Sequence, residues 1–142
     1  MKYILLKSIQ DPDIPHLLSV HLLPEISRFI DINEKKYFEY VTSTENVFYY
    51  KVFCDNMLVG SVHCEIVDRI LYLSLLVFPD FQRKGYGTQI INDIINGSLP
   101  FEFDAIEIAI DKTNVPSLRL FEKIGFIKTS VDGGLINYRY KK

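Results

Sequence analysis

The chain has 142 residues, of which 48% are hydrophobic and 24% are charged, and its formal net charge is −2 at pH 7. This length predicts one domain over residues 1–142, and the balance of apolar and charged residues excludes wholesale disorder. The slight acidic excess argues against a protein that binds nucleic acid duplexes, because such proteins normally carry a basic face.

The N-terminal segment is expected to form a short strand followed by two helices. "YILLKSI" is typical of a strand, and "QDPDIP" ends it. From about residue 14 to residue 45, apolar residues recur at helical spacing in two groups, which Pro24 and the polar "DINEKK" separate. The predicted buried positions of these two helices are Leu17, Leu18, Leu22, Ile26, Phe29 and Ile30.

A meander of three strands is predicted next. "NVFYYKVF", "MLVGSVHCEIV" and "ILYLSLLVF" are rich in β-branched and aromatic residues, which favour strands. Asp55-Asn56 and Asp68-Arg69 separate them, and Asx residues suit tight turns because they tolerate left-handed backbone.

The cysteine and histidine content predicts neither a disulfide nor a metal site. If residues 55 and 56 form a two-residue turn, Cys54 faces Met57 rather than Cys64, so both cysteines are expected to be free thiols. The histidines have no metal-ligand spacing. There is no apolar run of about 18 residues, and "MKYILLKSIQDPD" reaches acid and proline too early for a signal peptide. We therefore expect a cytoplasmic protein without a membrane partner.

The second half of the chain alternates helices and strands. "TQIINDIING" predicts a helix with Ile90, Ile91, Ile94 and Ile95 on one stripe and Gly97 at its end. "AIEIAI" predicts a buried strand, and "NVPSLRLFEKIGF" predicts a helix with proline in its first turn and glycine after its last. "VDGGL" predicts the turn of a terminal hairpin. This order of elements indicates an α/β domain with a mixed sheet.

The stretch "LLVFPDFQRKGYGT", residues 75–88, joins a strand to a helix through a glycine-rich turn. It does not fit a P-loop, which needs a lysine after its second glycine, because Lys84 precedes Gly85. It does not fit a dinucleotide fingerprint, because Ile90 stands where the last glycine belongs. Two interpretations remain: a turn without a ligand, or backbone N–H groups and a helix N-terminus that hold a diphosphate.

From Gln82 to Thr88 this turn resembles the pyrophosphate loop of the GNAT N-acetyltransferase superfamily. The block "NVPSLRLFEKIGF", residues 114–126, is similar to the family's downstream motif, in which an asparagine starts a helix beside the pantetheine arm of CoA. The order of elements resembles that of the family over essentially the whole chain. The resemblance implies a GNAT fold of α/β (α+β) type, with a mixed, mostly antiparallel sheet of about six or seven strands and about four helices.

The resemblance also implies acetyl-CoA as the cosubstrate, and no metal. The family holds the pantetheine arm on backbone groups where two neighbouring strands splay apart, and the matching positions are Leu75, Leu76 and Val77. The pyrophosphate would lie over the amides of residues 83–88. The implied CoA-binding residues are Leu75, Leu76, Val77, Gln82, Arg83, Lys84, Gly85, Tyr86, Gly87, Thr88, Asn114, Ser117 and Phe121.

The implied reaction is direct attack of a primary amine on the acetyl carbonyl in a ternary complex. The expected acceptor is a small-molecule amine or the amine of a peptide or protein, and family members often form homodimers. An amine of lysine type, with a pKa of roughly 10.4, is neutral in only about 1 molecule in 10³ at pH 7. A base must therefore take its proton.

Two positions depart from the family's pattern. Phe121 replaces the tyrosine that is proposed to protonate the leaving thiolate, and a phenyl ring donates no proton. Ala109 replaces the glutamate base of some protein-modifying members. These departures keep two other hypotheses open: a GNAT-like module that binds or senses acyl-CoA without transfer, and a nucleotide-binding protein that uses the loop for another diphosphate.

The sequence offers several other residues that could act as the base. His63 and Glu65 share one face of their predicted strand, opposite a cysteine. Asp111, Tyr72 and Ser74 lie on neighbouring predicted strands. We select Glu65 and Tyr72 as catalytic candidates, with a structural role for each, or a water chain to solvent as the base, as the alternatives.

Overall fold

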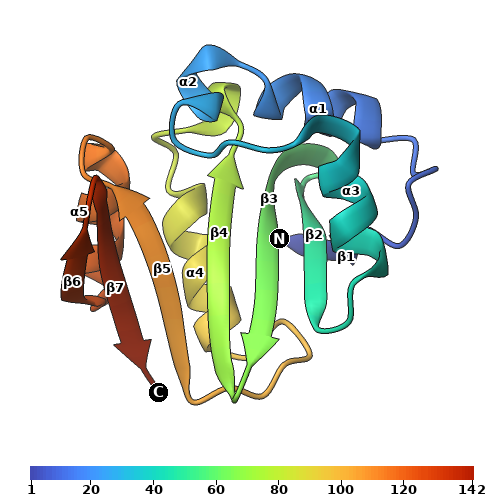
Figure 1. Ribbon diagram of the computed structural model, residues 1–142. Coiled ribbons are helices and arrows are strands. Elements are labelled where there is room, and N and C mark those ends of the chain that lie inside the picture. Colours follow the sequence, from blue (N-terminus) through green and yellow to red (C-terminus); the bar gives the residue numbers. More distant parts are fainter.

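The computed structural model describes residues 1–142 except for the side chain of Lys35. In the described chain, five α-helices and one short 3-10 helix accompany a seven-stranded sheet with the order β1-β2-β3-β4-β5-β7-β6 (Figure 1). The strands are β1 (Lys2–Leu5), β2 (Val47–Cys54), β3 (Met57–Val67), β4 (Ile70–Val77), β5 (Ala105–Asp111), β6 (Ile127–Asp132) and β7 (Leu135–Lys141). The helices are α1 (Ile14–His21), α2 (Pro24–Ser27), α3 (Glu34–Ser43), η1 (Pro79–Phe81), α4 (Tyr86–Ile95) and α5 (Val115–Ile124).

The sheet is mixed, as predicted. β4 and β5 run parallel, and all other neighbouring strands run antiparallel. α4 connects the two parallel strands, which suits a crossover connection. None of the described helices has the length and hydropathy that crossing a membrane requires.

The N-terminal helical region differs from the prediction, because it contains three helices instead of two. Pro24 does separate two segments, but it also begins α2: its fixed φ suits the first turn of a helix, where its missing N–H has no partner to lose. Leu17 and Ile26 are buried as expected. Leu22 is 47% exposed, because it caps the end of α1 beyond the buried stripe.

Both predicted turns of the meander are confirmed. Asp55 and Asn56 have φ values of 50° and 64°, and residues 68 and 69 are also left-handed, as a two-residue hairpin turn requires. Cys54 pairs with Met57, while Cys64 lies buried farther along β3, and both thiols are free.

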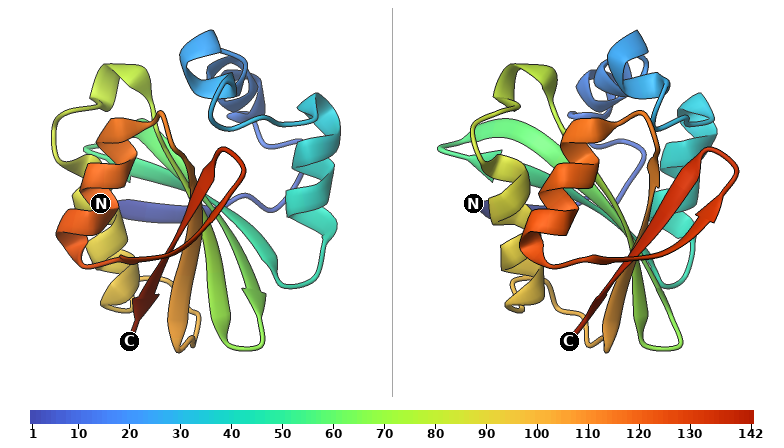
Figure 2. Two further views of the ribbon diagram at one scale, coloured as in Figure 1. Left: turned by 60° about the vertical axis from the view of Figure 1, so that its left-hand side comes forward. Right: turned by 90° about the vertical axis from the view of Figure 1, so that its left-hand side faces the viewer.

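The helices divide between the two faces of the sheet (Figure 2). On one face, α4 presents Ile90, Ile91 and Ile94, each at most 1% exposed, to a core that includes Leu71 and Ile106. α1, α2 and α3 pack on the other face, over a second cluster that involves mainly β2 and the end of β4. In the view of Figure 1 these three helices leave the lower parts of β4, β5 and β7 uncovered. This open part of the sheet is called the front face below.

Candidate functional site

A cleft opens where β4 and β5 separate. The two strands pair only from Ile70 to Tyr72 on β4, opposite Ala105–Glu107, although β4 continues to Val77. Beyond Tyr72 the strands diverge, so the edge of β4 that faces β5 has backbone groups available for another partner. The cleft has a volume of about 530 Å³.

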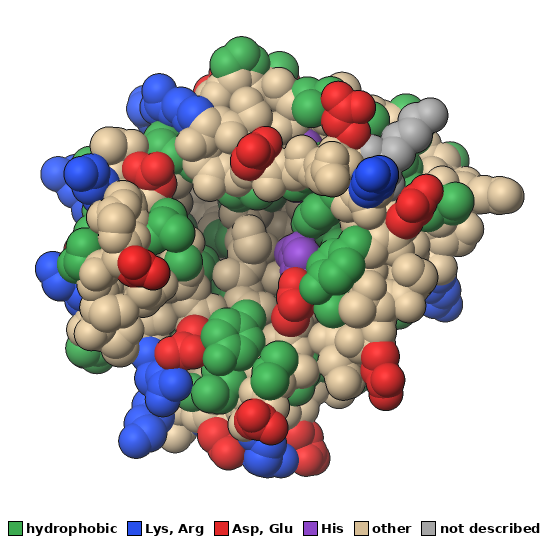
Figure 3. Space-filling model, viewed as in Figure 1, with side chains coloured by type: hydrophobic (Ala, Val, Ile, Leu, Met, Phe, Trp, Pro, Cys, Tyr) green, Lys and Arg blue, Asp and Glu red, His purple; other side chains and the backbone are tan. Residues whose placement is uncertain are grey.

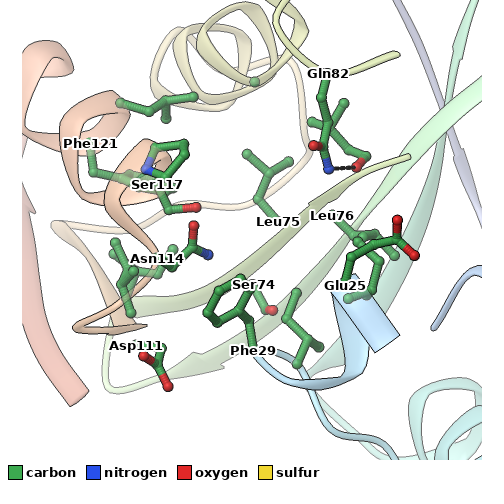
Figure 4. A pocket seen from close by; sticks show the side chains of 18 of the residues that line it. Glu25, Phe29, Ser74, Leu75, Leu76, Gln82, Asp111, Asn114, Ser117 and Phe121 are labelled. Atoms are coloured by element: carbon green, nitrogen blue, oxygen red, sulfur yellow. Dashed lines mark hydrogen bonds between the residues drawn. The ribbon is translucent and has the colours of Figure 1, made fainter. Parts of the chain in front are cut away.

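The walls of the cleft come from four parts of the chain (Figure 4). Leu75 lies on β4 in the middle, Asn114 and Ser117 point toward it from the start of α5, and Glu25 and Phe29 lie on the opposite side, on and after α2. The loop before α4 closes one end. A cleft with strand backbone in the middle and the short polar side chains of Asn114 and Ser117 on one side suits an extended, flexible ligand.

The structure brings together nearly all of the residues that the sequence predicted for CoA. The predicted residues that line the cleft are Leu75, Leu76, Val77, Gln82, Arg83, Gly85, Tyr86, Gly87, Thr88, Asn114, Ser117 and Phe121. Lys84 does not line the cleft, and its ammonium lies 5.8 Å from the ring centroid of Phe81. The binding role of each residue stays a prediction.

The loop before α4 offers donors for an anion. Arg83 and Gly85 have φ values of 63° and 84°, and this turn brings the chain into the N-terminus of α4 at Tyr86. No described side chain caps this helix, so its first N–H groups remain available at the end of the cleft. Gln82 holds the loop by donating from Nε2 to the carbonyl of Val77 at 3.0 Å.

The two glycines of the loop differ in their physical roles. A Cβ at Gly85 would meet nothing within 4 Å, so the left-handed backbone is what favours glycine there. A Cβ at Gly87 would lie 2.7 Å from Cδ1 of Leu120, so the absence of a side chain there lets α4 approach α5. We expected both glycines to allow backbone approach to a ligand, and the contact at Gly87 gives that residue a packing role as well.

The two catalytic candidates lie outside this cleft. Tyr72 is 41% exposed on the front face and lines a second cavity of about 510 Å³ with Ser74 and Glu107. The two cavities are adjacent, because Ser74, Ile108 and Ala109 line both. The pKa of Tyr72 is raised by partial desolvation and by Glu107, which makes its phenolate a less available base. Its catalytic role stays a prediction.

Glu65 belongs to a hydrogen-bonded cluster and lies opposite Tyr72, a residue of the second cavity, in the pairing of β3 and β4. Its Oε2 lies 2.7 Å from Nε2 of His63, and its Oε1 accepts a hydrogen bond of 3.0 Å from the hydroxyl of Tyr40. Nδ1 of His63 lies 2.7 Å from the hydroxyl of Tyr37. The shared face of His63 and Glu65 was predicted from the strand period. The hydrogen bonds from the two tyrosines of α3 were not predicted, because nothing in the sequence shows how this helix docks on the sheet.

Asp111, another residue considered as a base, lies at the cleft and is held as a turn carboxylate. Its Oδ1 accepts hydrogen bonds from the backbone N–H and the hydroxyl of Thr113, at 2.8 and 2.7 Å. These hydrogen bonds lower its pKa, so it takes up a proton less readily. Among the described residues, no group of three or more His, Cys, Asp or Glu is arranged to hold a metal ion.

The comparisons with known proteins agree with this geometry. The model of the acetyltransferase (GNAT) family matches residues 14–126. A domain from Methanocaldococcus jannaschii is 20% identical, with a TM-score of 0.80, and the match covers 99% of both chains. The N-acetyltransferase PseH from Campylobacter jejuni, in complex with acetyl coenzyme A, is 16% identical, with a TM-score of 0.77 over 99% of both chains.

A third neighbour is the spermidine N-acetyltransferase from Vibrio cholerae in complex with CoA and spermine. It is 14% identical, with a TM-score of 0.79, and the match covers 98% of this chain and 95% of that chain. No curated protein sequence matches the chain. At these identities, the neighbours show the fold.

Proposed function

The chain belongs to the GNAT acetyltransferase family, and from this premise we propose that it is an N-acetyltransferase that moves an acetyl group from acetyl-CoA to a primary amine by direct attack in a ternary complex. The observation that carries the proposal is the continuity of the cleft, from the free edge of β4 to the uncapped N-terminus of α4. Acetyl-CoA carries a thioester on a long arm, which the β4 edge can hold, and a diphosphate, which the helix N-terminus can hold, and one cleft contains both features.

The residues of the cleft fit acetyl-CoA. The pyrophosphate would bind to the first N–H groups of α4, where the helix dipole and the guanidinium of Arg83 favour negative charge. The pantetheine amides would hydrogen-bond with the backbone of Leu75 to Val77. Asn114 and Ser117 would contact the arm from the α5 side.

The chemistry requires a neutral amine next to the thioester. Its lone pair forms a bond to the acetyl carbon, the C–S bond breaks, and CoA leaves with the electron pair. A thiol has an ordinary pKa of roughly 8.5, so the thiolate is a fair leaving group without a general acid. Phe121 is 2% exposed and stacks edge-on against Phe126 at 5.1 Å, and its side chain donates no proton.

The experiment that tests the proposal is an assay of CoA thiol release against a panel of primary amines, peptides and polyamines. Spermidine and spermine belong in the panel, because one structural neighbour is a spermidine N-acetyltransferase. We expect turnover with at least one acceptor, above the rate of hydrolysis without an amine. Tight binding of acetyl-CoA without turnover of any acceptor would instead favour a non-catalytic acyl-CoA-binding module, the alternative that Phe121 supports.

Introducing a general acid is expected to speed the reaction. Phe121 lines the cleft, so Phe121→Tyr adds one hydroxyl there at little change in volume. General-acid catalysis typically raises a reaction rate by a factor of about 10² or more. The new hydroxyl is not optimally placed, so we expect kcat to rise by about tenfold. KM for acetyl-CoA should not change. The measurement is steady-state kinetics of the most active acceptor.

Phe126→Tyr is the matched control, because Phe126 is equally buried but does not line the cleft. It is expected to leave kcat unchanged. If Phe121→Tyr also leaves kcat unchanged, protonation of the thiolate does not limit the rate. If the protein is a non-catalytic module, neither variant turns over any acceptor.

A further inference from the structure

A line of three polar side chains crosses from α3 to β3 beside the cavities. The hydroxyl of Tyr37 lies 2.7 Å from Nδ1 of His63, and Nε2 of the same ring lies 2.7 Å from Oε2 of Glu65. Tyr37 is half-buried, the His63 side chain is 16% exposed, and the Glu65 side chain is 34% exposed. The line therefore runs from a sheltered hydroxyl to a carboxylate near solvent.

This line lies next to residues of the cavities, although none of its three side chains lines either cavity. His63 pairs with Ser74 across β3 and β4, and Glu65 pairs with Tyr72. Side chains opposite each other on one face of an antiparallel pair have Cβ atoms about 5 Å apart. Ser74 lines both cavities, so the Cβ of His63 lies about 5 Å from a residue of each. The space-filling view shows a hollow over this part of the sheet, with histidine and acidic side chains at its rim (Figure 3).

The partners of the ring define its tautomer. An ionised carboxylate only accepts hydrogen bonds, so Nε2 carries the hydrogen that is donated to Glu65. Nδ1 then has a lone pair and accepts the hydrogen of the Tyr37 hydroxyl. A hydroxyl, an imidazole and a carboxylate in this order can pass one proton from the hydroxyl to the ring, while the carboxylate stabilises the imidazolium.

The ordinary pKa of an imidazole is closer to that of an alkylamine than the ordinary pKa of a carboxylate is. Ordinary pKa values are about 10.4 for an alkylamine, 6.5 for an imidazole and 4.3 for a glutamate. The equilibrium constant for proton transfer from an alkylammonium is therefore roughly 10⁻⁴ when an imidazole accepts the proton and roughly 10⁻⁶ when a carboxylate accepts it. The ring of His63 is also placed to store the proton, because it lies between the Tyr37 hydroxyl and the Glu65 carboxylate.

We propose that Tyr37, His63 and Glu65 form the proton relay that neutralises the acceptor amine, a proposal that rests on the acetyltransferase function proposed above. One N–H bond of the ammonium breaks, and its proton bonds to the oxygen of Tyr37 as the hydroxyl hydrogen moves to Nδ1 of His63. The neutral amine forms the N–C bond, the C–S bond breaks, and the sulfur takes a second proton from the nitrogen. The imidazolium then returns its proton to solvent. Tyr37 and His63 are catalytic residues, and Glu65 is a positioning residue.

The neighbouring titratable groups do not oppose this role. His21 of α1 binds the hydroxyl of Tyr49 on β2 through Nε2 at 3.0 Å, and burial followed by the nearby His63 lowers its pKa to about 4, so it is neutral at pH 7. Tyr40 of α3 donates a hydrogen bond to Glu65. Desolvation raises the pKa of Tyr40, and also the pKa values of Tyr37, Tyr49 and Tyr72, so these four hydroxyls are neutral at pH 7. Glu65 is thus the charged group in contact with the ring.

The first test compares Tyr37→Phe, His63→Gln and Glu65→Gln with the wild type in steady-state kinetics from about pH 5.5 to pH 8. We expect Tyr37→Phe and His63→Gln each to lower kcat by about 10²-fold and to change the pH profile of kcat. Glu65→Gln is expected to lower kcat by about tenfold. KM for acetyl-CoA should not change in any of them.

Tyr3→Phe is the matched control, because it also removes a partly buried tyrosine hydrogen bond, here one of 2.6 Å to Asp93 that involves none of the relay residues. It is expected to keep the wild-type kcat and pH profile. Wild-type kcat and an unchanged pH profile in both Tyr37→Phe and His63→Gln would overturn the relay.

A second measurement separates failure of the relay from failure of the proposed function. Long-range ¹H–¹⁵N NMR spectra of the histidine rings at pH 8, assigned with His63→Gln, report the tautomer of His63 without any turnover. The relay requires the tautomer with hydrogen on Nε2, and its ring signals should shift when the acceptor that is most active in the thiol-release assay is added. The Nδ1–H tautomer, or ring signals that do not respond to an amine that is turned over, would refute the relay and leave the acetyltransferase function intact. Absence of turnover with every acceptor would instead refute the acetyltransferase function on which the relay rests.

Discussion

Replacing Ser117 by tryptophan is expected to abolish acetyl-CoA binding while the protein stays folded. Ser117 lies in α5 and points into the cleft toward Leu75, so an indole at this position occupies the channel (Figure 4). The helix propensities of tryptophan and serine are similar, so α5 itself is not destabilised. We expect the affinity to fall by at least about 10²-fold, or roughly 2.7 kcal/mol, as measured by isothermal titration calorimetry.

The matched control is Arg119→Trp on the same helix. Arg119 is exposed and does not line the cleft, so this variant adds the same ring without entering the channel. It should bind acetyl-CoA with the wild-type affinity. If Ser117→Trp retains wild-type affinity and an unchanged melting temperature, the ligand does not occupy the cleft between β4 and α5.

Acid is expected to destabilise the protein through His21. This residue is 2% exposed, and its Nδ1 is buried without a hydrogen-bond partner in the described part of the chain. Burial, and secondly His63, lowers its pKa from 6.5 to about 4. The unfolded chain therefore takes up this proton first as the pH falls, so the contribution of His21 is complete above about pH 6.5 and is lost on the way to pH 4. The loss is about 3 kcal/mol in the free energy of unfolding.

Urea denaturation at a series of pH values between 7 and 4 measures this effect. His21→Gln should lose about 3 kcal/mol less than the wild type over this interval, because its side chain does not titrate. His16→Gln, at an exposed position of the same helix, should keep the wild-type dependence. Equal pH dependence in the wild type and in His21→Gln would show that the buried imidazole is not the source.

The predictions from sequence succeeded where local chemistry determines local structure. The left-handed residues of the turn at Asp55 and Asn56, and the isoleucine stripe of α4, follow from side-chain type and spacing alone. The division of the N-terminal helices did not follow in the same way, because Pro24 both interrupts one helix and begins the next.

The candidate site was predictable in its loop and not in its walls. The spacing of Gly85 and Gly87 identified the loop, but the packing role of Gly87 depends on Leu120, a residue from a helix far along the chain. The aromatic residues Phe29 and Tyr37 suited either an acceptor site or a solvated amphipathic helix, and their contacts with the cleft and with His63 were not predicted, because these depend on how helices dock on the sheet. Such tertiary contacts leave no periodic signal in a single sequence.

The most direct measurement follows an isotopically labelled acetyl group from acetyl-CoA to the nitrogen of a primary amine by mass spectrometry, with wild-type protein and with Ser117→Trp side by side. A cleft that binds acetyl-CoA for transfer predicts a labelled N-acetyl product with the wild type and none above background with Ser117→Trp. Wild-type protein that binds acetyl-CoA yet labels no amine in the panel would contradict the proposed acetyltransferase function.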